Sequence, residues 1–364
     1  MGLKILLLNI ILVILEPFAL RQKIKDEVLF ISLESDELTG NFKMLSDSLT
    51  DKGIKCNYHL VKFEKTIKGN FLYLISCIKQ LFLINSSKLV IIDFNNYICC
   101  NYKRPEVKVF ELWHASGCIK KFGNETDRDY KVKGYDYILA AADSFKPFYS
   151  KAFNVPEDAV KVLGIPVTDD YFKEGYEGVA RDFYAAKYPI KDRKVILYAP
   201  TFRGRLMKGF KGEYLNVKHF IERLPDEYVL LYKMHPLISN YVLEDCDRAI
   251  NVSNENLTNL FYITDYLISD YSALIFDFSV FGRPMIFYTP DIEEYRSETG
   301  LFIDYENEMP GPIVKNEDDL IKALLEYPTQ DLERVELFAK KYATMTDGHS
   351  LERVTDFVVD VMKG

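Results

Sequence analysis

Short apolar runs recur along the chain, and each is followed by a polar loop and then by a stretch with helical spacing. A run that is apolar at nearly every position is typical of a strand that helices bury on both faces. The strand-loop-helix order therefore predicts an α/β fold with parallel sheets, in which ligands bind at the carboxyl ends of the strands. The runs lie at residues 28–31, 88–93, 107–110, 137–140, 160–163, 195–198, 229–232, 266–268 and 285–288.

The length of the chain predicts its division into domains. A chain of 364 residues is expected to form about two domains. We place the boundary between residues 167 and 176, before the second series of apolar runs begins at Val195. The predicted domains are residues 26–170 and 171–364, the second of which ends in a helix, and residues 1–25 form a separate apolar segment.

Charge and cysteine usage argue against two kinds of site. Residues 1–170 carry 23 Lys and Arg against 21 Asp and Glu, and the rest carries 23 against 33, so nothing indicates a nucleic-acid partner. The six cysteines show neither CxxC nor Cys/His metal-ligand spacing. This usage indicates reduced thiols in a cytosolic setting, and we expect no metal and no cofactor.

The N-terminal segment allows three interpretations. Leu3–Leu20 is apolar apart from three polar residues, and a basic flank follows it. Such a run is long enough to span a bilayer, but no small-residue cleavage site ends it and Glu16-Pro17 interrupts it, which argues against a secretory signal. It could span the membrane, lie on the cytoplasmic leaflet with its basic flank drawn to anionic lipid, or form a buried first element. We favour an anchor, peripheral or spanning, on the cytoplasmic side of the cell membrane.

Residues 266–314 combine a strand, a polar helix start, a second strand and an acidic loop. The turn Ser269–Ser272 places hydroxyls and a carboxylate where a helix begins, and free backbone N–H groups at such a start attract anions. The acidic loop after the second strand suits the hydroxyls of a ribose or polyol. This order is typical of a nucleotide-diphosphate pocket, although the turn alone also fits an ordinary helix cap.

Four further segments occur with it, in order: ELWHASGCIKKFG at 111–123, VILYAPTFRG at 195–204, LLYKMHPLI at 230–238 and TDGHSLERV at 346–354. Together the five segments resemble the CDP-glycerol glycerophosphotransferases that build teichoic acids, over residues 26 to 361. The hallmarks of that family are a WHG-type histidine, an APT-x-R turn, a K/R-x-H-P strand end, and D-Y-S-S followed by P-D-x-x-x-Y and G-P. The resemblance implies two Rossmann-like domains of the glycosyltransferase-B type, here with an N-terminal apolar helix, and a last helix that packs back across the interdomain cleft.

The resemblance also implies a reaction. Glycerol phosphate, or a related alditol phosphate, would pass from CDP-glycerol to a hydroxyl of a lipid-linked or polymeric acceptor, releasing CMP, in teichoic acid or capsule synthesis. The alternatives are a CDP-ribitol ribitolphosphotransferase, a glycosyltransferase of the same fold that uses a nucleotide sugar, and a membrane-associated scaffold whose site has decayed. A GxGxxG loop is missing from the sequence, so a dinucleotide dehydrogenase has no support.

Two histidines are the predicted catalytic residues. His114 follows the run at 107–110, and an imidazole there can take the proton of an attacking hydroxyl. His235 ends the run at 229–232 and would bind phosphate or act as an acid, with Lys233 on the same side of the strand. The predicted substrate-binding residues are Ser116, Lys120, Arg203, Lys233, Ser269, Asp270, Ser272, Asp291, Glu294 and Tyr295.

The chain departs from the family pattern at two places. Ala115-Ser116 follows His114 where the family has Gly-Thr, so backbone freedom that glycine would give is lost while the hydroxyl is kept. In the family's G-x-P-R-x-D segment, Val167 replaces the arginine and Asp169 keeps the carboxylate. The second departure puts a polyol contact with the acceptor or donor in doubt, and it is consistent with a different alditol phosphate, a different acceptor, or a compensating cation such as Arg128.

Overall fold

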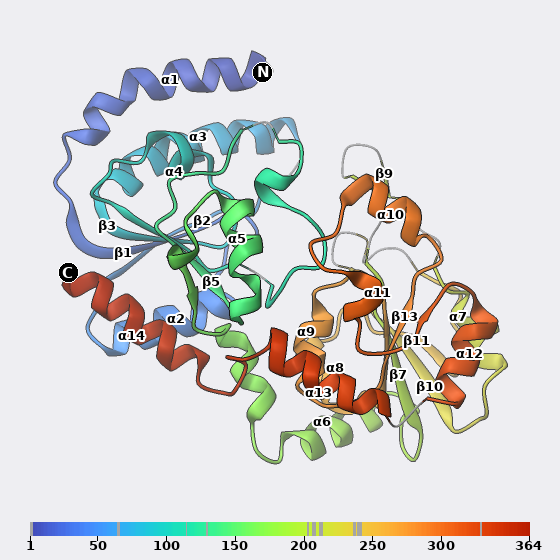
Figure 1. The fold of residues 1–364 in the computed structure, drawn as a ribbon. Coiled ribbons are helices and arrows are strands. Elements are labelled where there is room, and N and C mark those ends of the chain that lie inside the picture. The colour runs from blue at the N-terminus through green and yellow to red at the C-terminus, as the bar shows by residue number, and fades with distance from the viewer. Residues whose placement is uncertain are drawn as a thin grey trace. The chain divides into compact units, whose positions relative to one another are not determined.

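The computed structural model describes residues 3–63, 66–113, 115–128, 130–201, 204–205, 209–210, 214–235, 238, 242–327 and 330–364. It divides the chain into two compact units (Figure 1). Unit 1 comprises Met1–Ser116, Phe122–Asp169 and Met345–Gly364, and unit 2 comprises Gly117–Lys121 and Asp170–Thr344. The division after Asp169 lies close to the predicted boundary, but residues 345–364, expected in the second domain, belong to unit 1.

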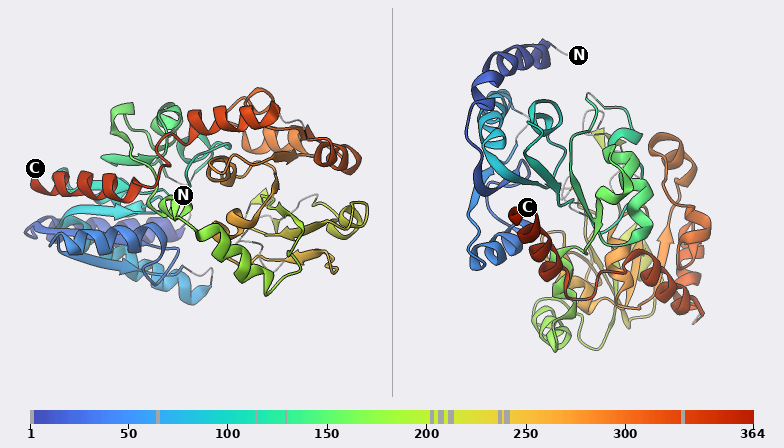
Figure 2. Two further views of the ribbon diagram at one scale, coloured as in Figure 1. Left: turned by 90° about the horizontal axis from the view of Figure 1, so that it is seen from below. Right: turned by 60° about the vertical axis from the view of Figure 1, so that its left-hand side comes forward.

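Unit 1 is built on a six-stranded parallel sheet with the strand order β2-β1-β3-β4-β5-β6. Helices α2 and α14 lie side by side on one face of it (Figure 2), where Leu45 and Val358 join strand residues such as Phe30 in one buried core. The strands are β1 (Lys25–Ser32), β2 (Cys56–Leu60), β3 (Ser87–Ile92), β4 (Lys108–Glu111), β5 (Tyr137–Ala140) and β6 (Val160–Val162). The helices are α1 (Leu3–Leu20), α2 (Gly40–Asp51), α3 (Ile67–Asn85), α4 (Tyr97–Tyr102), α5 (Lys146–Phe153) and α14 (Ser350–Lys363).

Unit 2 has a second six-stranded parallel sheet, ordered β11-β10-β7-β12-β13-β14. Both parallel sheets predicted from the sequence are thus confirmed. The strands are β7 (Lys194–Tyr198), β10 (Tyr228–Tyr232), β11 (Ala249–Asn251), β12 (Tyr266–Ser269), β13 (Met285–Tyr288) and β14 (Ile313–Val314), with a separate antiparallel pair, β8 (Gly204–Arg205) and β9 (Gly209–Phe210). The helices are α6 (Tyr176–Ala185), α7 (Val217–Glu222), α8 (Leu257–Ile263), α9 (Leu274–Ser279), α10 (Ile292–Thr299), α11 (Tyr305–Glu308), α12 (Glu317–Leu325) and α13 (Gln330–Tyr342).

The N-terminal helix α1 packs against α3 through one of its faces (Figure 1). Leu8, Leu12 and Ala19 are buried, and the Asn9 side chain accepts hydrogen bonds from the hydroxyls of Tyr97 and Tyr102. In the part of the chain that the structure describes, we find no helix long and apolar enough to cross a membrane.

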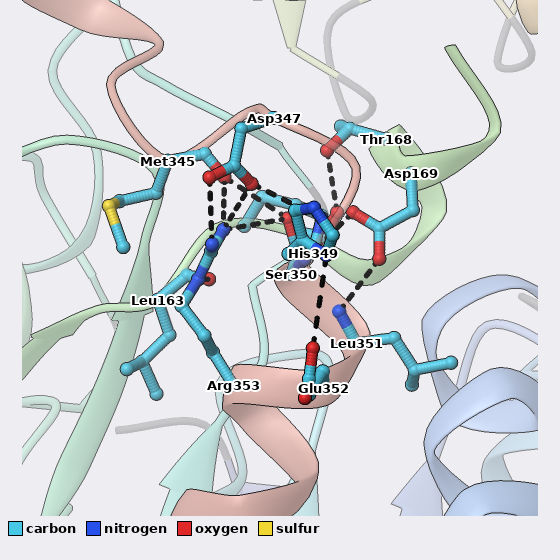
Figure 3. Close-up of polar contacts among 11 residues, drawn as sticks. Leu163, Thr168, Asp169, Met345, Asp347, His349, Ser350, Leu351, Glu352 and Arg353 are labelled. Carbon is cyan, nitrogen blue, oxygen red and sulfur yellow. Dashed lines mark hydrogen bonds and ion pairs between the residues drawn. The ribbon is translucent and has the colours of Figure 1, made fainter. Parts of the chain in front are cut away.

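The chain returns to unit 1 just before α14, and a carboxylate from far away in the sequence caps that helix (Figure 3). The N-cap residue, His349, makes no capping hydrogen bond with its own side chain. Asp169 replaces it, since its two carboxylate oxygens accept from the backbone N–H groups of Ser350 (2.9 Å) and Leu351 (2.8 Å). The carboxylate that the family pattern suggested for a polyol contact is thus engaged with a helix start.

Arg353 joins the same two chain segments (Figure 3). Its guanidinium donates to the backbone carbonyls of Leu163 (2.8 Å) and Met345 (2.6 Å) and pairs with both carboxylate oxygens of Asp347. This hydrogen bonding lowers the pKa of Asp347. Gly164 allows the close approach, because it has φ +84° and a Cβ there would lie 2.3 Å from both the Met345 carbonyl oxygen and the Ser350 Oγ.

Removing the distant cap should weaken unit 1. Asp169→Ala leaves two N–H groups at the start of α14 without their carboxylate, and the loss of such a cap lowers the free energy of unfolding by about 0.5–2 kcal/mol. The change also removes a negative charge that interacts favourably with the positive end of the helix dipole. We expect the melting temperature of unit 1 to fall by several degrees in calorimetry. Asp170→Ala is the matched control, because that carboxylate pairs with the exposed Lys173; an equal fall in both variants would contradict the capping role.

Candidate active site

The carboxyl ends of four neighbouring strands gather the predicted donor residues of unit 2. Strands β10, β7, β12 and β13 are adjacent and parallel, so the residues that follow them lie at the same edge of the sheet. Lys233 and His235 follow β10, Thr201 follows β7, and Asp270 follows β12. The parallel order thus brings together the APT, K-x-H-P and DYS segments. Arg203 lies outside the described residues.

Asp270 holds the end of β7 through its buried carboxylate. The backbone N–H of Thr201 donates to both carboxylate oxygens (2.9 and 3.0 Å), and the N–H of Tyr271 donates to one of them (2.6 Å). The neighbouring Ser269 hydroxyl donates to the Ala199 carbonyl (2.9 Å). Asp270 and Ser269 therefore position the turn that leads to Arg203. The sequence analysis counted Asp270 among the substrate-binding residues and did not identify Thr201, which lies 69 positions away, as its partner.

The acidic segment that the sequence analysis expected to be a loop forms helix α10 with Asp291 as its N-cap residue, and tyrosines join it to the DYS turn. The rings of Tyr271 and Tyr295 stack at 3.8 Å between centroids and 12° between planes, and the Tyr271 hydroxyl donates to Asp291 (3.1 Å). Tyr305 donates its hydroxyl to the Asp270 carbonyl (2.7 Å). Tyr295 and Asp291 thus help to shape this edge of the sheet, and Glu294 is exposed on α10.

Lys233 is engaged with the backbone. Its ammonium donates to the carbonyls of Ser253 (2.8 Å) and Glu255 (2.7 Å), which uses two of its three donors. Burial lowers the pKa of Lys233. The structure therefore gives Lys233 a part in fixing the loop after β11, whereas the sequence analysis expected it to bind phosphate directly. His235, two residues further on, is half-buried.

The helix after the DYS turn is shorter than predicted. It begins at Leu274 and has six residues, and its N-terminal side carries a weak contact from the Leu274 N–H to the Ser272 hydroxyl (3.4 Å). The polar turn Ser269–Ser272 therefore precedes the helix, because Asp270 and Ser269 bond to the neighbouring strand segment.

The predicted acceptor residues begin at the end of β4 in unit 1. The Trp113 backbone N–H donates to Glu111 (3.3 Å), and its indole stacks on Phe122 at 4.6 Å. Ser116 is buried. Lys120 belongs to unit 2, where the segment 117–121 pairs with residues 300–302. His114 lies outside the described residues, so its catalytic role stays a prediction.

The described part of the chain contains no cluster of three or more His, Cys, Asp or Glu side chains that could hold a metal ion.

Comparison with known proteins assigns the chain to a family. A ribitol-phosphate primase of teichoic acid from Bacillus spizizenii is 32% identical over 92% of this chain and 90% of its own length. A glycerol-phosphate primase from Bacillus subtilis is 30% identical over 79% of this chain and 77% of its own length. The solved structure of the wall teichoic acid polymerase TagF superimposes with a TM-score of 0.71 at 21% identity over 93% of this chain and 90% of that one, which shows the same fold. Because the sequence profile of the CDP-Glycerol:Poly(glycerophosphate) glycerophosphotransferases matches residues 14–360, the chain belongs to that family.

Proposed function

We propose that the chain transfers an alditol phosphate from a CDP-alditol to a hydroxyl of a lipid-linked or polymeric acceptor in teichoic acid or capsule synthesis. The family match over residues 14–360 carries this proposal. We propose CDP-glycerol as the donor, and CDP-ribitol as the alternative because one similar relative is a ribitol-phosphate primase. The new P–O bond forms to the acceptor oxygen, the diphosphate P–O bond breaks, and CMP leaves.

The edge of the unit 2 sheet is the proposed donor site. Phosphoryl transfer of this kind depends on placement and charge neutralisation more than on covalent chemistry. His235 and Arg203 would contact the diphosphate, Ser272 would add a hydroxyl, and Asp291 and Glu294 would meet the hydroxyls of the ribose or alditol. Asp270, Ser269, Lys233 and Tyr271 would hold these groups in place through the hydrogen bonds described above.

The acceptor is proposed to meet unit 1 and the segment after it. His114 would take the proton of the acceptor hydroxyl as the P–O bond forms, since an imidazole titrates near neutrality. Ser116 and Lys120 would bind the acceptor, the lysine through a phosphate.

A donor panel tests the proposed function. Purified protein is given CDP-glycerol, CDP-ribitol or a UDP-sugar together with a defined lipid-linked acceptor, and the release of CMP or UDP is measured with the mass of the product. We expect CMP and an acceptor heavier by one or more alditol phosphates. Release of UDP with transfer of a sugar would replace the proposal by a glycosyltransferase.

The outer face of α1 is proposed to dock on the anionic cytoplasmic leaflet. Ile10, Val13, Ile14 and Phe18 face away from the buried side of the helix and are 50–63% exposed. Phe71, near the start of the neighbouring helix α3, is also exposed. A basic flank directly after α1, formed by Arg21, Lys23 and Lys25, complements an anionic surface.

Substitutions on this face should separate membrane binding from folding. Because Leu12 on the opposite face is buried, deleting α1 would also expose the core of unit 1. Ile10→Gln with Ile14→Gln changes only the outer face, where these side chains are 50% and 63% exposed. Because full burial of such a side chain contributes about 1.5–3 kcal/mol and only about half of each would be newly buried, we expect binding to phosphatidylglycerol vesicles in sedimentation to weaken by about tenfold to a hundredfold.

Two exposed residues on other helices provide the control. Val179→Gln with Leu337→Gln removes side chains of similar exposure, 61% and 64%, from α6 and α13. Equal loss of vesicle binding in both double variants, or none in the α1 variant, would refute docking through α1.

A further inference from the structure

Two carboxyl groups at the carboxyl ends of neighbouring strands in the unit 1 sheet, one buried and one half-buried, have no part in the proposed chemistry. Glu111 ends β4 and is 0% exposed, and Asp93 directly follows the neighbouring strand β3. Asp93 accepts a hydrogen bond from the Ser32 hydroxyl at 2.8 Å. Among the described residues, the Glu111 Oε2 and Asp93 Oδ1 atoms are buried and have no hydrogen-bond partner.

Among the residues that the structure describes, no ion pair joins either carboxyl group to Lys or Arg, so burial dominates the protonation of both groups. Burial and the nearby Asp93 raise the pKa of Glu111 well above its usual range. Burial raises the pKa of Asp93 to about 7, with a smaller contribution from Glu34, while the Ser32 hydrogen bond opposes the rise. A neutral Glu111 keeps a carbonyl oxygen that can accept a hydrogen bond.

The Glu111 carboxyl group accepts a hydrogen bond from Trp113, the residue before the predicted base His114. The Trp113 N–H donates to the Glu111 Oε1 (3.3 Å), and Trp113 has φ +25°, a region in which residues other than glycine are strained. Its indole stacks on Phe122 and meets the edge of Phe153 at 5.3 Å, which fixes the side chain. The backbone strain persists because the carboxyl group and the aromatic rings determine the position of Trp113 together.

We propose that Glu111 is a positioning residue, whose buried carboxyl holds the Trp113 backbone in its left-handed conformation and so sets the direction in which the chain presents His114. The catalytic consequence rests on the proposed function, since it assumes that His114 is the base. The structural part of the proposal is independent of the proposed function, because it concerns only the contact between Glu111 and Trp113.

The tryptophan itself reports on this contact, because Trp113 is the single tryptophan of the chain. We expect Glu111→Leu to shift the emission maximum and change the near-ultraviolet circular dichroism of Trp113, since the leucine fills the space but accepts no hydrogen bond. Glu111→Gln keeps an acceptor oxygen at the same reach and should preserve both signals. Glu27→Gln is the matched control, a change at a carboxyl 2% exposed at the start of β1.

A shorter acid provides the decisive variant if the leucine protein does not fold. Glu111→Asp keeps the carboxyl but withdraws it by one methylene, so it should change the Trp113 signals as the leucine variant does. Wild-type emission and circular dichroism in Glu111→Asp would overturn the proposal.

Activity then tests the catalytic consequence. We expect kcat to fall about tenfold or more in Glu111→Leu and Glu111→Asp with the KM for the CDP-alditol unchanged, and to recover in Glu111→Gln, because misplacing a catalytic group costs rate rather than donor binding. Changed Trp113 signals with wild-type kcat would refute the catalytic consequence. An inactive wild-type protein would refute the proposed function, while the spectroscopic comparison would still decide the role of Glu111.

The pH dependence gives a readout that general destabilisation would not move. The titratable groups that face the pair are Glu34, Cys99, Cys100 and Tyr135, and the Ser32 hydroxyl donates to Asp93. Because the pKa of Asp93 is near 7, its ionisation should alter the Trp113 emission of the wild type between about pH 6 and pH 8. Asp93→Asn should abolish this change, and its persistence would count against coupling between the pair and the Trp113 turn.

Discussion

Replacing His114 with alanine is expected to reduce turnover by about 10²–10⁴-fold, the contribution typical of general acid–base catalysis. The acceptor hydroxyl must lose its proton as it attacks phosphorus, and no other histidine lies in the same segment of the sequence. The affinity for CDP-alditol should change little, because the proposed donor residues lie in unit 2. Steady-state kinetics with a soluble acceptor and calorimetry with the donor measure the two effects separately.

His219→Ala is the matched control for this experiment. His219 is 59% exposed on α7, pairs with Glu317 at 2.6 Å, and belongs to none of the five family segments. Its removal should leave both turnover and donor affinity unchanged. Near-wild-type turnover in His114→Ala would remove that histidine from the mechanism.

Asp270→Ala is expected to weaken donor binding by about tenfold to a hundredfold or more. The change leaves the N–H groups of Thr201 and Tyr271 without their buried acceptor, and each such loss costs about 1–3 kcal/mol. The turn leading to Arg203 would then lose its fixed position. Calorimetry with CDP-glycerol and CDP-ribitol measures the affinity, and a thermal scan measures the accompanying loss of stability.

A change at Asp265, an aspartate at the opposite end of the same sheet, distinguishes a loss of donor affinity from a loss of stability. Asp265 precedes β12 and accepts a hydrogen bond from the Val195 N–H at 2.7 Å, so it also holds a neighbouring strand. Asp265→Ala should lower the melting temperature and leave donor affinity unchanged. Equal loss of affinity in both variants would show that Asp270 acts through overall stability alone.

The sequence by itself predicted the two parallel sheets and the edge at which the donor motifs meet. Apolar runs such as Val229–Tyr232 can only be buried on both faces, and parallel order places the residues after them at one edge. That is why the segments that carry Lys233 and Asp270 could be assigned to the same edge of the sheet without coordinates. The family motifs added the chemistry expected there.

The partner of each polar side chain was decided only by the tertiary structure. Asp169 caps a helix that begins 181 positions later, Lys233 binds two backbone carbonyls, and Asp270 holds Thr201. The apolar helix α1 buries one face and exposes the other, although nearly every residue in it is hydrophobic. Periodicity and local motifs predict which groups can be buried or hydrogen-bonded. A hydrogen bond between distant segments depends on which segments the tertiary fold brings together, and a local sequence pattern does not contain that information.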